Sequence, residues 1–257
     1  MRRLFYFLIT ALLITFVCAC SPVATEEREP PYISPYSWDN LVVENGRYTY
    51  YKNNELASSV GIDVSDHQKE IDWQAVADDG IEFAIIRIGN RGYTEGGLFL
   101  DGQFEANMAG AENIGIKRGV YFFSQAITKE EALEEAAFVL DALGGRNLDY
   151  PVVYDHEPVT DSSGRANRLS SDQLSKNTQA FCEAIEEAGY KTMIYGNKKD
   201  IGRLDSSIRD TYDIWFAEYD TGIPSGQFDF IMWQYSSKGN VAGISTYVDM
   251  NIHFLQA

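Results

Sequence analysis

Two acidic residues, two positions apart, are the strongest candidates for chemistry in this chain of 257 residues. Asp155 and Glu157 follow an apolar run at positions 151–154. In an extended strand alternate side chains point to the same side, so both carboxylates face one way, with their alpha carbons about 6.5 Å apart. Repulsion and partial burial are expected to raise the pKa of one of them. A protonated acid beside an ionised carboxylate is what cleavage of a glycosidic bond requires.

Two further acids follow or interrupt other apolar runs. Asp63 comes directly after Val60-Gly61-Ile62, and Asp249 lies in Tyr247-Val248-Asp249-Met250-Asn251. With 38 Asp and Glu residues in the chain, one Asp-x-Glu arises by chance, so the pair alone is weak evidence. Convergence of four carboxylates from three strands is stronger evidence. The residues alone leave a glycosidase cleft, an acidic cation site and an ordinary solvated surface as alternatives.

Short β-branched or aromatic runs alternate with helical patterns from residue 60 onward, which favours an α/β fold. Eight strands suggest a closed barrel, with the polar residues at the strand ends around its mouth. The last three connections are too short for full helices, so we predict a flattened, incomplete (β/α)8 TIM-like barrel with an N-terminal β-hairpin appendage. The candidate strands are Val60–Val64, Phe83–Ile88, Lys117–Phe123, Pro151–Asp155, Thr192–Tyr195, Asp213–Ala217, Phe230–Gln234 and Thr246–Asp249.

Two of the connecting helices have clear boundaries. The first begins at a capping box of Thr128 and Glu131 and ends at Gly144, and the second runs from about Ser171 to Ala188. Cys182 falls in the second pattern and is predicted to be a buried small residue. The expected buried faces are Leu133, Ala136, Leu140 and Leu143 in the first helix, and Leu174, Thr178, Phe181, Ile185 and Ala188 in the second.

The N-terminus has the pattern of an export signal. A charged start precedes 14 mostly apolar residues, Leu4–Val17, and Ala19-Cys20 follow. This run is short for a membrane-spanning helix of about 20 residues. We therefore predict a lipoprotein signal peptide at 1–19 with Cys20 as the lipid-modified residue, plain secretion being the alternative. The predicted localisation is bacterial and extracytoplasmic, with membrane attachment through the lipid on Cys20.

Composition divides the rest of the chain. Pro and Glu residues dominate 20–37, which predicts an extended tether. The dipeptide Asn45-Gly46 between two strand patterns predicts a type I′ hairpin within an appendage at 38–59. The catalytic barrel is predicted at 60–257.

Several classes of function are disfavoured. A net charge of −17 argues against nucleic acid as a partner, because phosphate contacts need a basic face. His67, His156 and His253 lack the spacing of metal ligands. We therefore expect no metal, no organic cofactor and no nucleic acid.

The strand ends also carry aromatic and polar residues that suit a saccharide cleft. The alternative for each aromatic residue is a place in the barrel core. Arg87 ends an apolar strand, where a charge usually pairs with a carboxylate, so it either tunes the acidic cluster or contacts substrate. The candidate substrate-binding residues are Arg87, Tyr121, Tyr195, Trp215, Tyr219, Trp233 and Gln234.

At these positions the chain resembles glycoside hydrolase family 25, the Chalaropsis-type lysozymes. The resemblance covers about residues 60–255. The matching stretches together are specific to this family, although no single stretch would be sufficient. The matching stretches are Gly61-Ile62-Asp63-Val64-Ser65 with Gln68, Ile71-Asp72-Trp73, Phe83-Ala84-Ile85-Ile86-Arg87, Gly119-Val120-Tyr121-Phe122-Phe123-Ser124, Tyr150-Pro151-Val152-Val153-Tyr154-Asp155-His156-Glu157, Met193-Ile194-Tyr195, Trp215-Phe216-Ala217-Glu218-Tyr219, Trp233-Gln234-Tyr235 and Val248-Asp249-Met250-Asn251.

This resemblance implies hydrolysis of the β-1,4 bond between N-acetylmuramic acid and N-acetylglucosamine in peptidoglycan glycan strands, without a cofactor. By position Glu157 matches the general acid and Asp155 its partner carboxylate, which in a substrate-assisted route would orient the sugar's 2-acetamido group. Asp63 and Asp249 match the two further acids of the cleft. Lys69 departs from the family pattern, which commonly has Gly there, and His156 stands where an aromatic residue is common.

Two alternative functions remain open. One is a non-catalytic lipoprotein that binds peptidoglycan, and the other is a glycosidase acting on another 2-acetamido polymer such as chitin. Intact Asp155 and Glu157 argue against the first. The absence of the longer acidic strand motif expected of chitinases argues against the second.

Overall fold

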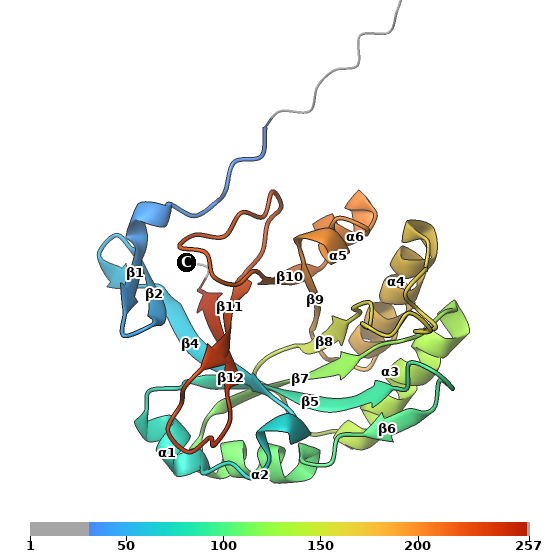
Figure 1. Cartoon of the computed structure of the whole chain (residues 1–257), viewed down its shortest axis with the longest axis horizontal. Coiled ribbons are helices and arrows are strands. Elements are labelled where there is room, and N and C mark those ends of the chain that lie inside the picture. The colour runs from blue at the N-terminus through green and yellow to red at the C-terminus, as the bar shows by residue number, and fades with distance from the viewer. Residues whose placement is uncertain (1–30, 256–257) are drawn as a thin grey trace, which may run out of the picture. The chain divides into compact units, whose positions relative to one another are not determined.

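A barrel of eight strands forms the centre of the computed structural model, which describes residues 31–255 (Figure 1). Around the barrel the order is β4, β12, β11, β10, β9, β8, β7 and β5, and β5 pairs with β4 to close it; β6 extends β5 outside the closed ring. The strands are β4 (Ser58–Val64), β5 (Phe83–Arg91), β6 (Leu98–Leu100), β7 (Lys117–Phe123), β8 (Val152–Asp155), β9 (Thr192–Asn197), β10 (Asp213–Ala217), β11 (Met232–Gly239) and β12 (Val248–Phe254). All eight predicted strands are present: Lys117–Phe123 and Asp213–Ala217 match at both ends, and the other six have shifted ends.

One strand runs against the expectation of a parallel barrel. β12 is antiparallel to both of its neighbours, β11 and β4, whereas the neighbouring pairs from β4 through β5 and β7 to β11 are parallel. Only residues 240–247 connect β11 to β12. A parallel crossover needs a dozen or more residues, so this short connection reverses the chain instead. The amino end of β12 therefore lies at the mouth where the parallel strands end.

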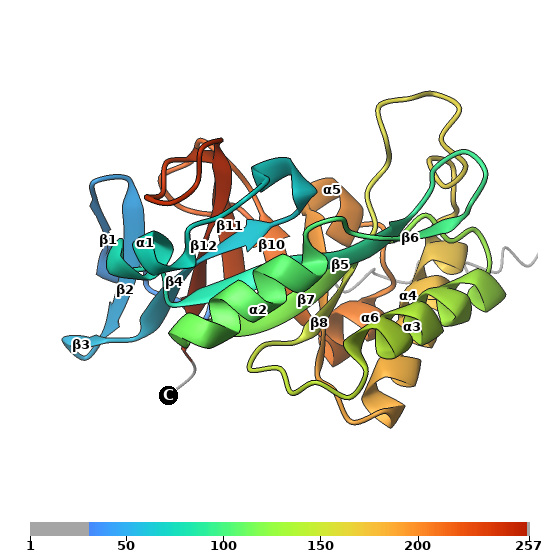
Figure 2. The same cartoon turned by 90° about the horizontal axis from the view of Figure 1, so that it is seen from below.

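Helices cover the outside of the barrel along the parallel strands (Figures 1 and 2). The connection from β9 to β10 holds only two short helices, and no helix follows β10 or β11, as the short connections predict. The helices are α1 (Trp73–Asp78), α2 (Phe104–Ile114), α3 (Lys129–Leu143), α4 (Ser171–Glu187), α5 (Lys198–Ile201) and α6 (Ser206–Thr211), with 3-10 turns η1 (Trp38–Asn40) and η2 (Asp66–Gln68).

The predicted capping of α3 is confirmed in part. The Thr128 side chain accepts a hydrogen bond from the backbone N–H of Glu131, and Gly144 ends the helix in a left-handed conformation. The Glu131 carboxylate, however, accepts from the N–H of Ile127 rather than from that of Thr128.

The predicted buried face of α3 needs correction. Leu133 is 41% exposed, and the buried residues are Ala132, Glu135, Ala136, Val139 and Leu143. Ala136 and Leu143 are buried as predicted, Leu140 is partly buried against the core, and the buried face also includes Glu135, whose carboxylate lies 2.8 Å from Arg91 Nε. In α4 the predicted residues Leu174, Thr178, Phe181 and Ile185 are buried, as is Cys182, whereas Ala188 lies beyond the helix end and is exposed.

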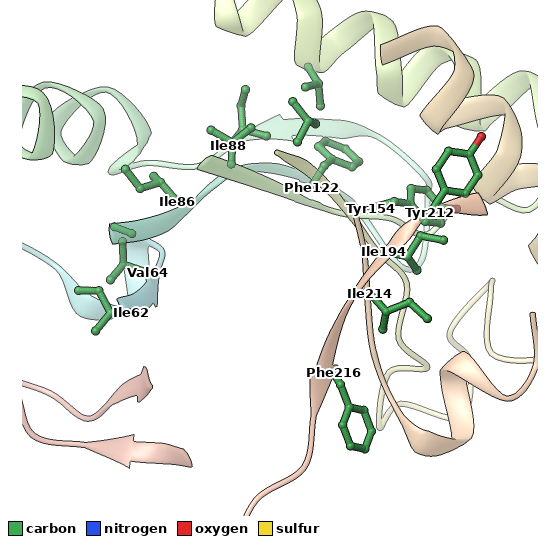
Figure 3. Packing of buried hydrophobic residues seen from close by; sticks show 14 of the residues in the cluster. Ile62, Val64, Ile86, Ile88, Phe122, Tyr154, Ile194, Tyr212, Ile214 and Phe216 are labelled. Atoms are coloured by element: carbon green, nitrogen blue, oxygen red, sulfur yellow. The ribbon is translucent and has the colours of Figure 1, made fainter. Parts of the chain in front are cut away.

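Strand alternation divides the apolar residues into two cores. One set points into the barrel and includes Phe83, Val153, Trp215 and Met232. Gly61 makes room for this interior, because a Cβ at that position would lie 2.4 Å from the Phe83 ring. The other set lies outside the barrel wall, and most of it faces the helices, whereas Phe216 on β10 packs on Phe228 and Phe230. Figure 3 shows Ile62, Val64, Ile86, Ile88, Phe122, Tyr154, Ile194, Tyr212, Ile214 and Phe216.

The predicted hairpin is present and belongs to a small antiparallel sheet of three strands. β1 (Leu41–Glu44) and β2 (Arg47–Lys52) flank Asn45 and Gly46, whose φ angles of 53° and 76° are both positive, as a type I′ turn requires. The third strand, β3 (Glu55–Leu56), was not predicted.

The N-terminal segment covers the side of the barrel that lacks helices. The Tyr48 ring packs on Trp233 at 4.9 Å, and Tyr36 stacks on Phe254 at 4.3 Å. Aromatic residues on the outer faces of β11 and β12 are therefore buried by the segment that precedes the barrel. This cover replaces the missing outer helices.

The predictions for residues 1–30 lie outside the described residues. These are the signal peptide at 1–19, the lipidated Cys20 and the tether at 20–37 as far as residue 30. Within residues 31–255 no helix is both long and apolar enough to cross a membrane.

Candidate active site

A cavity of about 180 Å³ at the mouth of the barrel is lined by the four carboxylates that the sequence singles out. They come from β4, from β8 and the segment just after it, and from β12. Every predicted site residue except Arg87, Trp233 and the undescribed Cys20 lines this cavity, which consists of Asp63, Tyr121, Asp155, Glu157, Tyr195, Trp215, Tyr219, Gln234 and Asp249.

The antiparallel direction of β12 brings Asp249 into this group. Asp249 is the register partner of Asp63 in the pairing of β12 with β4. Directly opposed residues of an antiparallel pair have their Cβ atoms about 4.5–5.5 Å apart on one face of the sheet. The two carboxylates are therefore close neighbours although β12 enters the mouth from the opposite direction.

Asp155 and Glu157 line the same cavity, as strand alternation predicts, and the neighbouring segment 124–125 holds them in place. The backbone N–H of Ser124 donates to the carbonyl oxygen of Asp155 at 2.7 Å, and the Gln125 amide donates to that of Glu157 at 2.9 Å. His156 is buried and faces away from this cavity, with Nδ1 at 3.3 Å from the Ser124 carbonyl oxygen. These contacts hold the backbone of Asp155 at the end of β8 and that of Glu157 just after it.

Two side-chain amides hold the Asp63 carboxylate. Gln234 Nε2 and Asn251 Nδ2 donate to Asp63 Oδ2 at 2.7 and 2.8 Å. Gln234 in turn accepts from the hydroxyl of Tyr195 at 2.8 Å and from that of Tyr219. The indole N–H of Trp215 donates to Asn251 Oδ1 at 2.8 Å. The orientation of Asp63 is thus fixed by a hydrogen-bonded chain that includes three of the aromatic residues in the cavity wall.

Desolvation raises the pKa of all four carboxyl groups, and the charges of neighbouring carboxylates add to this for Asp63, Asp155 and Glu157. The pKa of Glu157 rises to about 7, because of desolvation and the charges of Asp200 and Asp249. Desolvation raises that of Asp249 to about 6. Desolvation and the charge of Glu157 raise the pKa of Asp155 well above its usual range. The cavity therefore retains protons close to neutral pH.

The pKa of Asp63 shows opposing influences. Desolvation and the charge of Asp249 raise it, whereas the hydrogen bonds from Asn251 and Gln234 lower it. The net direction is upward. The amides thus partly offset the cost of an ionised Asp63 in this cavity.

Arg87 ends its strand paired with carboxylates, as the sequence suggests. Its Nε lies 2.6 Å from Asp101 Oδ2, and its Nη2 contacts Asp66. It does not line the cavity, but its positive charge lowers the pKa of Asp155. Arg87 therefore acts on the acidic cluster through its charge, and its contact with substrate stays a prediction.

The prediction that Trp233 contacts substrate is wrong for this cavity. Gln234 points into the barrel, so strand alternation turns Trp233 outward. Its side chain is 0% exposed and packs on Tyr48, and its indole N–H donates to the Glu218 carbonyl oxygen at 2.9 Å. Trp233 is therefore a core residue between the barrel and the N-terminal sheet.

Two residues that the sequence analysis gave no role belong to the site. Asn251 positions Asp63 through a hydrogen bond. It lies two residues after Asp249 on the same strand, so strand alternation could have placed its side chain on the side of the cavity. Asp200 is buried in α5 just after β9, where Asn197 Nδ2 donates to its Oδ2 at 2.6 Å. Its charge contributes to the raised pKa of Glu157. A single acidic residue in a short helix gave no sequence signal.

Lys69, which stands where the family pattern commonly has Gly, has a backbone conformation that accounts for that preference. It follows η2 with φ 59° and ψ −139°, a backbone conformation that glycine adopts far more readily. The preference for Gly at this position thus has a conformational basis.

Within residues 31–255 no group of three or more His, Cys, Asp or Glu side chains is arranged to hold a metal ion.

Comparison with known proteins agrees with this geometry. The profile of the glycosyl hydrolases family 25 matches residues 62–244. The chain is 29% identical to the autolytic lysozyme of Clostridium acetobutylicum over 194 residues, 74% of this chain and 54% of that protein. It is 30% identical to lysozyme M1 of Streptomyces globisporus over 207 residues, 74% of this chain and 66% of that protein. The matched region thus spans about half the length of the first relative.

Solved structures share the fold. A bacterial lysozyme from Streptomyces coelicolor superposes with a TM-score of 0.66 at 27% identity, covering 77% of this chain and 93% of that one. The modular autolysin LytC from Streptococcus pneumoniae, solved in complex with a synthetic peptidoglycan ligand, superposes with a TM-score of 0.69 at 24% identity, covering 84% of this chain and 52% of that one.

Proposed function

The chain belongs to glycosyl hydrolase family 25, and we propose that it is an N-acetylmuramidase that cleaves the β-1,4 bond between N-acetylmuramic acid and N-acetylglucosamine in peptidoglycan. The observation that carries this proposal is the shared cavity of Asp63, Asp155, Glu157 and Asp249. Similarity to two lysozymes supports peptidoglycan as the substrate.

Glu157 is the proposed general acid. Its raised pKa of about 7 keeps the carboxyl group protonated in mildly acidic and near-neutral solution. It would deliver this proton to the glycosidic oxygen as the bond from that oxygen to the anomeric carbon breaks, so that the leaving sugar departs as a neutral alcohol. The Glu157 carboxyl group is largely desolvated, and among the described residues it belongs to no group of side chains arranged to hold a metal ion. This environment favours the role of general acid over that of a surface carboxylate.

Asp155 is the proposed partner that orients the substrate. Its Oδ1 is buried and has no hydrogen-bond partner among the described residues. This oxygen is therefore free to accept the N–H of a 2-acetamido group, whose carbonyl oxygen then attacks the anomeric carbon. Water opens the resulting ring and returns the proton to Glu157. This route follows the family resemblance, and the unpartnered oxygen supports it.

The proposed site of action is outside the cytoplasm. The N-terminal pattern supports export, and we extend the proposal to a lipid on Cys20 that attaches the mature protein to the membrane. Metabolic labelling with a radioactive or alkyne-tagged fatty acid tests this point. Labelling of the wild type and its loss in Cys20→Ala is the expected result, whereas an unlabelled, freely secreted wild type would reject the anchor.

Digestion of purified peptidoglycan with mass analysis of the products tests the reaction. The expected products are muropeptides with N-acetylmuramic acid at the new reducing end, released by the wild type and not by Glu157→Gln. A Glu187→Gln variant, altered at the exposed end of α4, is the matched control and should behave like the wild type. Binding of peptidoglycan without any release, or faster cleavage of chitooligosaccharides than of peptidoglycan, would reject the proposal.

A further inference from the structure

A second and larger cavity continues the cleft beyond Glu157. It has a volume of about 460 Å³, against about 180 Å³ for the carboxylate cavity. Three residues line both cavities: Glu157, Tyr195 and Tyr219. The proposed proton donor thus stands at the border between them. A glycan cut beside Glu157 must place sugar on both sides of the broken bond, so one strand would occupy both cavities.

The charge of the second cavity differs from that of the first. Lys198 and Lys199 line it, and both are exposed. Neither lies within ion-pair distance of a carboxylate in residues 31–255, although the charge of Lys199 acts to lower the pKa of the neighbouring Asp200. The carboxylate cavity, by contrast, contains no lysine or arginine in its wall. In a chain of net charge −17, this pair of cations beside the proposed substrate cleft offers a contact for an anionic group of the substrate.

Two acidic residues, Glu157 and Glu218, line the same wall. Glu218 accepts hydrogen bonds from the backbone N–H and the hydroxyl of Ser225, at 2.5 and 2.6 Å. Lys198 donates to the Ser225 carbonyl oxygen at 3.2 Å, which holds its ammonium group near this loop. The hydrogen bonds to Glu218 come from uncharged donors, so the two lysines stand against the Glu218 carboxylate and Glu157, and the wall carries one net positive charge when Glu157 is protonated.

We propose that the cavity lined by Lys198 and Lys199 binds the carboxylates of the peptide stem that a muramyl residue carries. This inference rests on the proposed function for its substrate and adds the part of the substrate that the second cavity recognises. The sugar rings of a peptidoglycan strand are uncharged, whereas the stem peptide attached to the lactyl group of a muramyl residue carries carboxylates. Two lysines along one wall suit such a flexible anionic chain, because an ammonium group accepts several contact geometries.

Binding to defined oligosaccharides tests the proposal independently of turnover. The probes are two soluble peptidoglycan tetrasaccharides, free of phosphate polymers, one with its peptide stems and one with the stems removed by an amidase. The stem-free probe keeps one lactyl carboxylate on each muramyl residue, so the comparison measures the additional carboxylates of the stem. Calorimetry with the full mature chain carrying Glu157→Gln measures both affinities without cleavage. We expect tighter binding of the stem-bearing probe, and a further Lys198→Met/Lys199→Met change should weaken that binding about three- to tenfold. The loss for the stem-free probe should be clearly smaller.

Matched variants separate charge from shape. Lys198→Arg/Lys199→Arg keeps the charge and should retain most of the preference for stems. Lys191→Met is the control, because Lys191 is exposed and precedes β9 at the opposite end of the barrel. Added salt should weaken the preference for stems, since exposed charges are screened.

The two proposals fail in different ways. Equal affinity for both probes, or an equal loss for both in the double Lys→Met variant, would overturn the stem site even if the wild type cleaves peptidoglycan. Absence of cleavage by the wild type would reject the muramidase proposal, while a stem preference that depends on the two lysines would still support the stem site. A preference that persists in the double Lys→Met variant would assign stem recognition to other residues and overturn the inference.

Discussion

Asp63 and Asp249 are register partners across the antiparallel pair of β4 and β12, so two acidic side chains lie directly opposite each other at the barrel mouth. Like charges in such a position destabilise a sheet, and the structure offsets this cost with amide donors to Asp63. Tertiary packing thus maintains an unfavourable arrangement of charges. Such an arrangement is typical of sites whose carboxyl groups must retain protons.

Replacement of Asp249 tests this repulsion. Asp249→Asn removes a negative charge that raises the pKa of both Asp63 and Glu157. The alkaline limb of the pH profile of kcat/KM should therefore move to lower pH, and the maximal rate should fall because Asp249 lines the cavity. Asp213→Asn, at the far end of the barrel, should change neither property. An unchanged alkaline limb in Asp249→Asn would refute the electrostatic account of this residue.

Asp200 is predicted to act on the same pKa from outside the carboxylate cavity. Asp200→Asn keeps an oxygen that can accept from Asn197 but removes the charge that raises the pKa of Glu157. Its alkaline limb should also move to lower pH, with a smaller loss of maximal rate than in Asp249→Asn. Activity measured across pH on soluble peptidoglycan fragments checks this. A lower maximal rate with an unchanged alkaline limb would indicate that Asp200 has a purely structural role.

The sequence alone predicted the eight strands and the acids at the mouth because alternation and strand-end position are local properties. Asp155 and Glu157 share a side for this reason. Strand direction is not local, so β12 was expected to be parallel. Its short connection from β11 was the available signal, and it was used only to predict missing helices.

The wrong predictions concern side chains whose place depends on distant partners. Trp233 appeared to be a cleft residue because it follows a strand pattern, but the N-terminal sheet buries its outer face through Tyr48. Leu133 appeared to be buried but is exposed, whereas the charged Glu135 is buried because it pairs with the distant Arg91. Asp200 had no sequence signal because its effect on Glu157 arises only from the folded structure.

The raised pKa of Glu157 makes a prediction about stability. The pKa of Glu157 is about 7 in the folded protein, against an ordinary value of 4.5, so the folded protein binds more protons than the unfolded chain between these two values. Stability should therefore fall as pH rises through this window. Glu157→Gln removes the ionisable group and should be about 1–3 kcal/mol more stable than the wild type at pH 8, with little difference at pH 4. Denaturant unfolding at both pH values measures this, and a Gln variant that is less stable at pH 8 would argue against a buried, proton-retaining Glu157.

The N-terminal sheet should contribute to barrel stability. Tyr50 is buried against Phe254, with ring centroids 5.4 Å apart, whereas the adjacent Tyr51 is 39% exposed. Tyr50→Ala should lower the free energy of unfolding by about 2–4 kcal/mol, because it opens a cavity beside the outer face of β12. Tyr51→Ala is the matched control and should change it by less than about 1 kcal/mol. Equal effects of the two variants would show that the sheet is not an integral cover of the barrel.

The central claim is that Glu157 supplies the proton for bond cleavage, and the pH dependence of kcat/KM tests it most directly. On soluble peptidoglycan fragments the wild type should lose activity with an alkaline limb at a pKa of about 7. Glu157→Gln should reduce the rate by about 10²–10⁴-fold and remove this limb, while the far-UV circular dichroism stays unchanged. A Gln variant that retains the wild-type rate, or that keeps the same alkaline limb, would contradict the assignment.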